Sequence, residues 1–147
     1  MHSAILQPVV VLIAWTLVML VWMLATRLPA MVAAGVDLRS LRGSKPADAD
    51  RGLPATAQWK AHNYNHLHEQ PVLFYAVAIV IALTGTGDGI NAWIAWAYVA
   101  LRIAHSLWQS LVNTVRVRLA QFLLATLALV ALTLHAYVPS FRSSQRP

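Results

Sequence analysis

Four long apolar stretches divide the sequence, and polar segments separate them. The pattern predicts helices over residues 4–28, 56–83, 90–113 and 117–138. Each stretch can cross a hydrocarbon core, which needs about 20 consecutive apolar residues. We therefore expect one all-α integral membrane domain over residues 1–147, built as a bundle of four transmembrane helices.

The first apolar stretch also has to be weighed as a cleaved signal peptide. Met1, His2 and Ser3 supply no Lys or Arg before it, and its length far exceeds a signal core of about 7–15 residues. We expect it to remain in the mature protein as a helix. Residues 29–55 are polar and predict a surface loop, whereas the glycine-rich residues 84–89 predict a tight turn between antiparallel helices.

Basic residues indicate how the bundle is oriented. Most of them fall on the side that holds the 29–55 loop and the link between the last two helices: Arg27, Arg39, Arg42, Lys45, Arg51, Lys60, Arg116 and Arg118. Lys and Arg concentrate on the cytoplasmic side of membrane proteins. The long first loop is therefore predicted to be cytoplasmic and both termini to lie outside.

Composition agrees with a membrane protein and excludes several other classes. The chain is 59% hydrophobic and 11% charged, whereas a soluble domain has about a quarter of its residues charged. It has no cysteine, which excludes disulfides and thiolate metal sites. The net charge of +6 is expected to serve topology and lipid contact, not nucleic-acid binding. Tryptophans are expected to face lipid or its interface: Trp15, Trp22, Trp93, Trp96 and Trp108.

Polar side chains inside the second and third helices are the unusual feature of the chain. In the second helix, offsets of three and four place one set on a common face: His62, Asn65, His66 and Glu69. Three neighbours lie off this face and are expected to meet water or a neighbouring subunit: Lys60, Asn63 and His68. Pro71 is expected to kink the helix just past Glu69.

The third helix carries a second polar seam. Its members repeat at steps of three and four residues: Arg102, His105, Gln109, Asn113 and Arg116. Charged side chains at bilayer depth cost at least about 2.5 kcal/mol and so normally face a protein interior. We expect the two seams to face each other, with Arg102 as the partner of Glu69.

Three interpretations of these seams stay open. The polar groups could hold helices together as interhelical hydrogen bonds. They could bind an anionic ligand, because guanidinium groups clamp carboxylates while imidazoles and amides fix orientation. A metal site on His62, His66 and Glu69 with His105 is the third, and Arg102 argues against it because a fixed cation repels a metal ion.

The residues from His62 to Phe74 and from Arg102 to Ser106 resemble the MAPEG superfamily, the membrane-associated proteins in eicosanoid and glutathione metabolism. The similarity covers nearly the whole chain and is to bacterial-type members. It implies a homotrimer in a bacterial inner membrane, with glutathione sites between adjacent subunits near the cytoplasmic side. It also implies a lipophilic small-molecule substrate that enters from the lipid bilayer.

The resemblance also implies roles for particular residues. Glu69 corresponds to the family glutamate that holds the glutathione amino group, and Arg102 and His105 correspond to the third-helix pair. Arg116 or Arg118 corresponds to the arginine that activates the thiol. Further glutathione-binding candidates come from the second helix: His62, Asn65 and His66.

The chain departs from the family pattern in the second helix, where His62 replaces an arginine and His66 an asparagine. A neutral imidazole cannot clamp a carboxylate as a guanidinium does. Two functions are therefore expected as alternatives. One is a glutathione-dependent transferase or peroxidase that conjugates or reduces a lipophilic electrophile. The other is a non-catalytic binding or scaffold protein of the same fold, or a subunit of a larger membrane complex.

Overall fold

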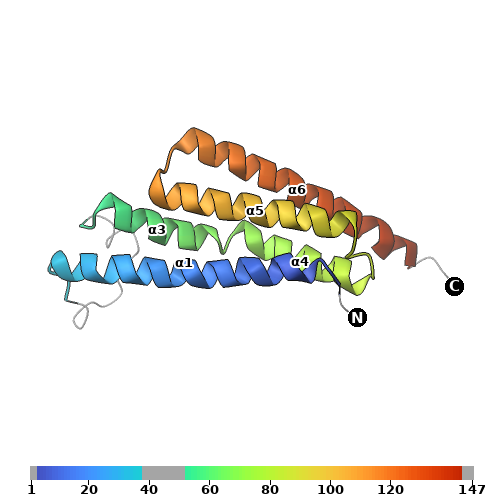
Figure 1. Cartoon of the computed structure of the whole chain (residues 1–147), viewed down its shortest axis with the longest axis horizontal. Helices are drawn as coiled ribbons and strands as arrows, with labels where there is room; N and C mark the ends of the chain where they lie inside the picture. Colours follow the sequence, from blue (N-terminus) through green and yellow to red (C-terminus); the bar gives the residue numbers. More distant parts are fainter. Residues whose placement is uncertain (1–2, 38–51, 144–147) are drawn as a thin grey trace.

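The computed structural model describes residues 3–37 and 52–143 and arranges them as an antiparallel helical bundle (Figure 1). The helices are α1 Leu6–Ala33, α3 Ala55–His66, α4 Gln70–Leu83, α5 Ile90–Leu111 and α6 Val115–Ser143. Helices α3 and α4 follow one another along the same line, so that the pair runs beside α1 (Figure 1). Helix α5 packs against α1, α3 and α6. The predicted 29–55 loop lies partly outside the described residues.

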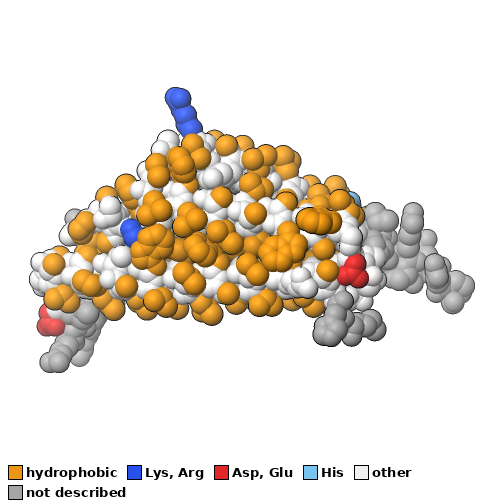
Figure 2. All heavy atoms as spheres, in the orientation of Figure 1, with side chains coloured by type: hydrophobic (Ala, Val, Ile, Leu, Met, Phe, Trp, Pro, Cys, Tyr) orange, Lys and Arg blue, Asp and Glu red, His pale blue; other side chains and the backbone are white. Residues whose placement is uncertain are grey.

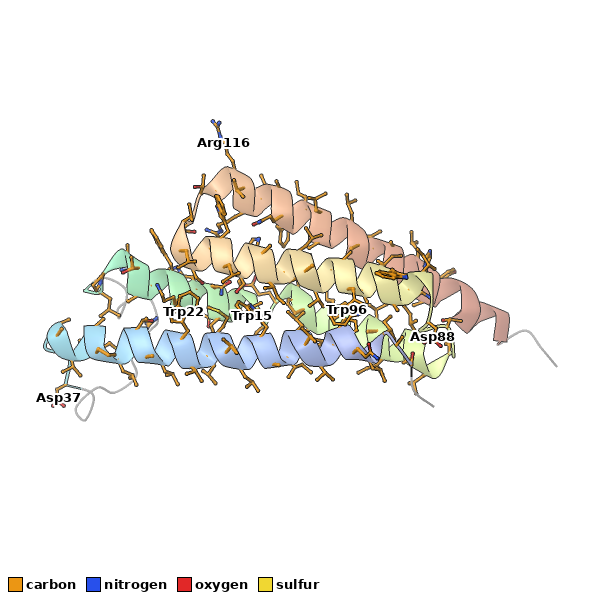
Figure 3. The ribbon with its side chains drawn as sticks, in the orientation of Figure 1. Trp15, Trp22, Asp37, Asp88, Trp96 and Arg116 are labelled. Carbon is orange, nitrogen blue, oxygen red and sulfur yellow. The ribbon has the colours of Figure 1, made fainter. Side chains whose placement is uncertain are left out.

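Three stretches of the described chain are long and apolar enough to cross a membrane: Leu6–Ala33, Ala55–Leu83 and Val115–Tyr137. Hydrophobic side chains cover most of the face in Figure 2, and Asp37 and Asp88 lie near opposite ends of the bundle in Figure 3. These features make the chain an integral membrane protein. Helix α5 is not among the three because buried polar residues lower its hydropathy.

Helix ends differ from the predicted bounds for identifiable reasons. Helix α1 continues past Leu28 and Pro29 to Ala33. It stops where Gly35 adopts a φ of 72° and Val36 N donates to Met31 O, which is a Schellman cap. Helix α5 stops at Leu111, two residues early, because Asn113 adopts a φ of 59°. Helix α6 starts at Val115 and runs to Ser143, longer than expected at both ends.

The predicted second helix is broken in two. Helix α3 ends at His66 and α4 begins at Gln70, so the break covers residues 67–69 and lies before Pro71. The prediction of one helix with a kink past Glu69 was therefore wrong. Proline has no N–H to donate, and its ring crowds the carbonyl four residues earlier, here that of Leu67. At the break, the backbone donor of the His66 carbonyl is Glu69 N, at a long 3.4 Å.

The start of the chain docks onto the turn between α4 and α5. Ile5 N donates to Gly87 O at 2.9 Å, and Ala4 N donates to Asp88 Oδ1 at 2.8 Å. Gly87 is buried, and a Cβ placed on it would collide with the side chains of Ser3 and Ile5. The absence of a side chain at Gly87 therefore allows α1 to be fixed at this end.

We predict that Gly87→Ala lowers the thermal unfolding temperature of the purified protein in detergent. Inserting a methyl group into a packed site costs about 1–3 kcal/mol. Gly52→Ala is the matched control, since a Cβ there meets open space. Equal unfolding temperatures for the two variants would contradict this account of the turn.

Candidate functional site

The face of α3 that packs into the bundle is not the predicted one. Lys60, Asn63 and Leu67 are buried, whereas His62 and Asn65 are exposed. The expectation that Lys60 and Asn63 face water or another subunit was therefore wrong. Helical spacing identifies which residues share a face but leaves open which face packs. Contacts of α3 with both α1 and α5 decide that question here.

A hydrogen-bonded set joins three helices at the buried face of α3. Asn63 Nδ2 and Trp15 Nε1 both donate to Ser106 Oγ, at 2.7 Å and 3.0 Å. Ser106 is fully buried and Asn63 is 1% exposed. Trp15 is thus an interhelical donor and not the lipid-facing anchor expected from sequence. This set fixes α1 and α3 against α5.

Nearer the start of α3, Lys60 also joins α3 to α5. Its ammonium donates to Thr56 O at 2.9 Å and to Ser110 O at 3.4 Å. It also lies 5.3 Å from the ring centre of Trp22, a distance at which a cation is attracted to an aromatic face. Carbonyls and a tryptophan ring therefore compensate for the burial of this charge.

Arg102 closes the break between α3 and α4. The side chain is 1% exposed, and its Nη2 donates to the carbonyl oxygen of His66 at 3.0 Å. In an unbroken helix that carbonyl would accept from the N–H of Gln70. The predicted ion pair with Glu69 is not formed, because the exposed Glu69 carboxylate bonds instead to His66. Arg102 therefore gives the His66 carbonyl a shorter hydrogen bond than the 3.4 Å contact from Glu69 N.

The imidazole of His66 is held at the same place. Its Nδ1 lies 2.6 Å from Glu69 Oε2, and its ring centre lies 5.2 Å from that of His105 and 5.9 Å from that of Phe122. His105 is 2% exposed, and its Nε2 donates to Gln109 Oε1 at 3.2 Å. Rings from α3, α5 and α6 thus meet beside the helix break.

A pocket of about 250 Å³ opens at this meeting point. Its lining comes from α3, α5 and α6: His66, His105, Val115, Arg118, Leu119 and Phe122. Arg118 Nη1 donates to Asn113 Oδ1 at 2.7 Å, and its Nε has no hydrogen-bond partner among the described residues. Arg116, by contrast, projects away from the bundle in Figure 3.

The pocket brings together only some of the residues predicted from sequence. His66, His105 and Arg118 line it, and Glu69 and Arg102 contact His66 from outside. The exposed His62, Asn65 and Arg116 are not among the lining residues. Phe122 was missed because only the fold brings the start of α6 close to His66. Asn113 was predicted on the third helix but lies in the turn after α5. Within residues 3–37 and 52–143, no three His, Asp or Glu side chains form a group that could hold a metal ion.

A second, apolar groove of about 630 Å³ runs between α4 and α6. It is lined mainly by aliphatic residues, including Leu73, Val77 and Val130. Gln70 Nε2 donates to Thr126 Oγ1 at 2.8 Å, and both residues line the groove. On α6, Thr126 lies four residues after Phe122, which lines the small pocket. One helical turn of α6 therefore separates the groove from the pocket.

We predict that Ser106→Ala destabilises the protein by about 2–3 kcal/mol, because it leaves buried donors on Asn63 and Trp15 unpaired. Ser110→Ala is the matched control on the same helix. Ser110 is equally buried, at 1% exposed, and its hydroxyl has no partner among the described residues. Unfolding in detergent should separate the two variants, and a Ser110→Ala loss as large as that of Ser106→Ala would contradict the assignment.

Comparison with known protein families gives one match. The sequence model of the MAPEG family matches residues 5–138, which is nearly the whole chain. Comparisons with curated proteins and with solved structures give no match. The apolar helices described above fit the membrane character of that family. The chain therefore belongs to the MAPEG family, the membrane-associated proteins in eicosanoid and glutathione metabolism.

Proposed function

We propose that the protein is a glutathione-dependent membrane enzyme that conjugates or reduces a lipophilic electrophile. The observation that carries the proposal is the pocket in which Arg118, His66 and His105 converge. A thiolate is the nucleophilic form of a thiol, and a nearby cation favours it by lowering the thiol pKa. The pocket takes the thiol end of glutathione, and the polar remainder extends over the exposed side of α3.

Arg118 is the residue we assign to the thiolate. Its guanidinium lines the pocket, and the bond to Asn113 leaves other N–H groups to donate. Asn113 itself is fixed by the turn between α5 and α6, so the guanidinium is oriented before a ligand arrives. Arg116 is assigned no catalytic role, because its side chain projects away from the bundle (Figure 3).

The apolar groove between α4 and α6 is assigned to the lipophilic substrate. Its aliphatic walls suit a hydrocarbon chain, and its end at Gln70 and Thr126 lies one turn from the pocket. A substrate that enters sideways from the lipid can thus place its electrophilic end near the thiol. Burial of the remainder along the groove supplies binding energy of about 25 cal/mol per Å² of apolar surface.

Glu69 is the strongest reason to propose a homotrimer. Its side chain is 66% exposed in the single chain, and it lies midway along the Ala55–Leu83 candidate span. A charge at that depth facing lipid costs at least about 2.5 kcal/mol, so protein normally covers it. The exposed His62 and Asn65 lie on α3 and precede Glu69 in the chain. A neighbouring subunit that covers this face completes the glutathione site between chains.

Helix α5 is proposed as the fourth spanning helix. Its 22 residues give a length of roughly 33 Å, and its polar residues Arg102, His105 and Gln109 are buried inside the bundle. The start of α3 and the α5–α6 link lie at the same end (Figure 1). Because most basic residues belong to that end, we place it in the cytoplasm of a bacterial inner membrane.

We predict that Arg118→Met lowers kcat for glutathione conjugation by about 10²-fold, since removing one charge-stabilising donor typically costs that much. Arg116→Met is the matched control and should retain activity close to that of the wild type. Rates are measured with purified protein, glutathione and a chromogenic lipophilic electrophile. If Arg116→Met loses activity and Arg118→Met keeps it, the assignment of the two arginines is wrong.

The absence of saturable glutathione binding to wild-type protein at millimolar concentration would support the non-catalytic alternative. The assembly has its own test. Native mass measurement in lipid nanodiscs should give three copies per particle. A particle that remains a monomer would contradict the proposal that a second chain covers Glu69.

A further inference from the structure

A carboxylate–imidazole pair lies at the mouth of the pocket. Glu69 Oε2 and His66 Nδ1 are 2.6 Å apart. An ionised carboxylate only accepts hydrogen bonds, so the hydrogen of this contact is on Nδ1. The neutral ring then has its lone pair on Nε2, the nitrogen that Glu69 does not occupy. The carboxylate both fixes this tautomer and stabilises the ring once it carries a second proton.

The ring is also fixed in position. Arg102 donates to its backbone carbonyl at 3.0 Å, and the tilted rings of His105 and Phe122 are its aromatic neighbours. The side chain is 21% exposed, in contrast to the 2% exposure of His105. His66 is therefore the imidazole that a ligand in the pocket can reach.

We propose that His66 is the general base that accepts the thiol proton, with Glu69 as its positioning partner. This inference rests on the proposed function, because it assigns a proton acceptor within the same pocket. A general base has to lie within hydrogen-bonding reach of the proton it takes. His66 lines the pocket with Arg118, which places a base and a cation on one ligand group.

The step balances in atoms and charge. The S–H bond breaks, its electron pair stays on sulfur, and the proton forms an N–H bond at His66 Nε2. The thiolate then forms a C–S bond with an epoxide-type electrophile, whose C–O bond breaks. The resulting alkoxide takes the proton back from Nε2, and His66 returns to its neutral form.

Charges around the ring fit this transfer. Glu69 faces Nδ1, while Arg102 and His105 approach from α5 and Arg118 from α6. Proton transfer leaves the total charge of the site unchanged. It converts the neutral thiol and the neutral His66 ring into a thiolate and an imidazolium. The imidazolium then lies between the Glu69 carboxylate and the thiolate, with Arg118 beside the thiolate. Opposite charges therefore alternate in the product of the transfer.

The test uses the ultraviolet absorbance of the thiolate in the whole protein in nanodiscs, together with a separate calorimetric measurement of glutathione binding. Wild-type protein should bind glutathione and show the thiolate band. His66→Asn should bind with similar affinity, lose most of the band, and lower kcat by about 10²-fold. His68→Asn is the matched control. His68 is exposed, its Nδ1 bonds to Tyr64 O, and it is not among the residues that line the pocket.

The variant His66→Ala provides a second test in case His66→Asn folds poorly. In His66→Ala, added free imidazole should restore part of the thiolate band, because it can occupy the vacated space. One result overturns the inference alone: an undiminished thiolate band in a His66→Asn variant that binds glutathione. Wild-type protein that binds glutathione without a band overturns both the inference and the assignment of Arg118 to the thiolate. Wild-type protein that binds no glutathione overturns the proposed function as well, so the two failures are distinguishable.

Discussion

The hydrogen bond from Arg102 to the carbonyl of His66 is the contact around which the rest of the site is arranged. Pro71 cannot continue the helix hydrogen-bond pattern, so the chain breaks at residues 67–69 and leaves backbone carbonyls without their usual donors. At His66 the remaining backbone donor is Glu69 N, at 3.4 Å, and poorly satisfied carbonyls are costly in a membrane interior. Arg102 supplies the donor. Arg102 belongs to a buried polar seam along α5 that also holds His105 and Gln109. These polar residues keep α5 from being among the three most clearly apolar spans.

The broad architecture could be predicted from sequence because it follows from apolar run length. The positions of the helices and the burial of Arg102, His105 and Gln109 along one side of α5 both come from such patterns. The packed face of α3 could not be predicted. His62, Asn65 and Glu69 share one face and Lys60 and Asn63 belong to another, and nothing local distinguishes them. The partner of Arg102 was also inaccessible, since a backbone carbonyl carries no signature in the residue types.

The histidine at position 66, which departs from the family pattern, lines the pocket. By the resemblance stated above, His66 occupies a position where the family pattern has an asparagine, and its ring contacts Glu69 and lines the pocket with Arg118. An asparagine could orient a ligand there but could not take its proton. The replacement is therefore consistent with a change in how the thiol is activated. The adjoining apolar groove, one turn of α6 away, is where we propose that the lipophilic substrate binds.

The break before Pro71, bridged by the hydrogen bond from Arg102 to the His66 carbonyl, determines the geometry of the site. Glutathione affinity and unfolding temperature of Pro71→Ala, measured together, test it most directly. Alanine restores an N–H and removes the steric conflict, so the helix can continue and the His66 carbonyl no longer needs Arg102. We predict a protein at least as stable as the wild type, with glutathione affinity lowered about tenfold, which is about 1.4 kcal/mol. Unchanged affinity in a folded variant would contradict it.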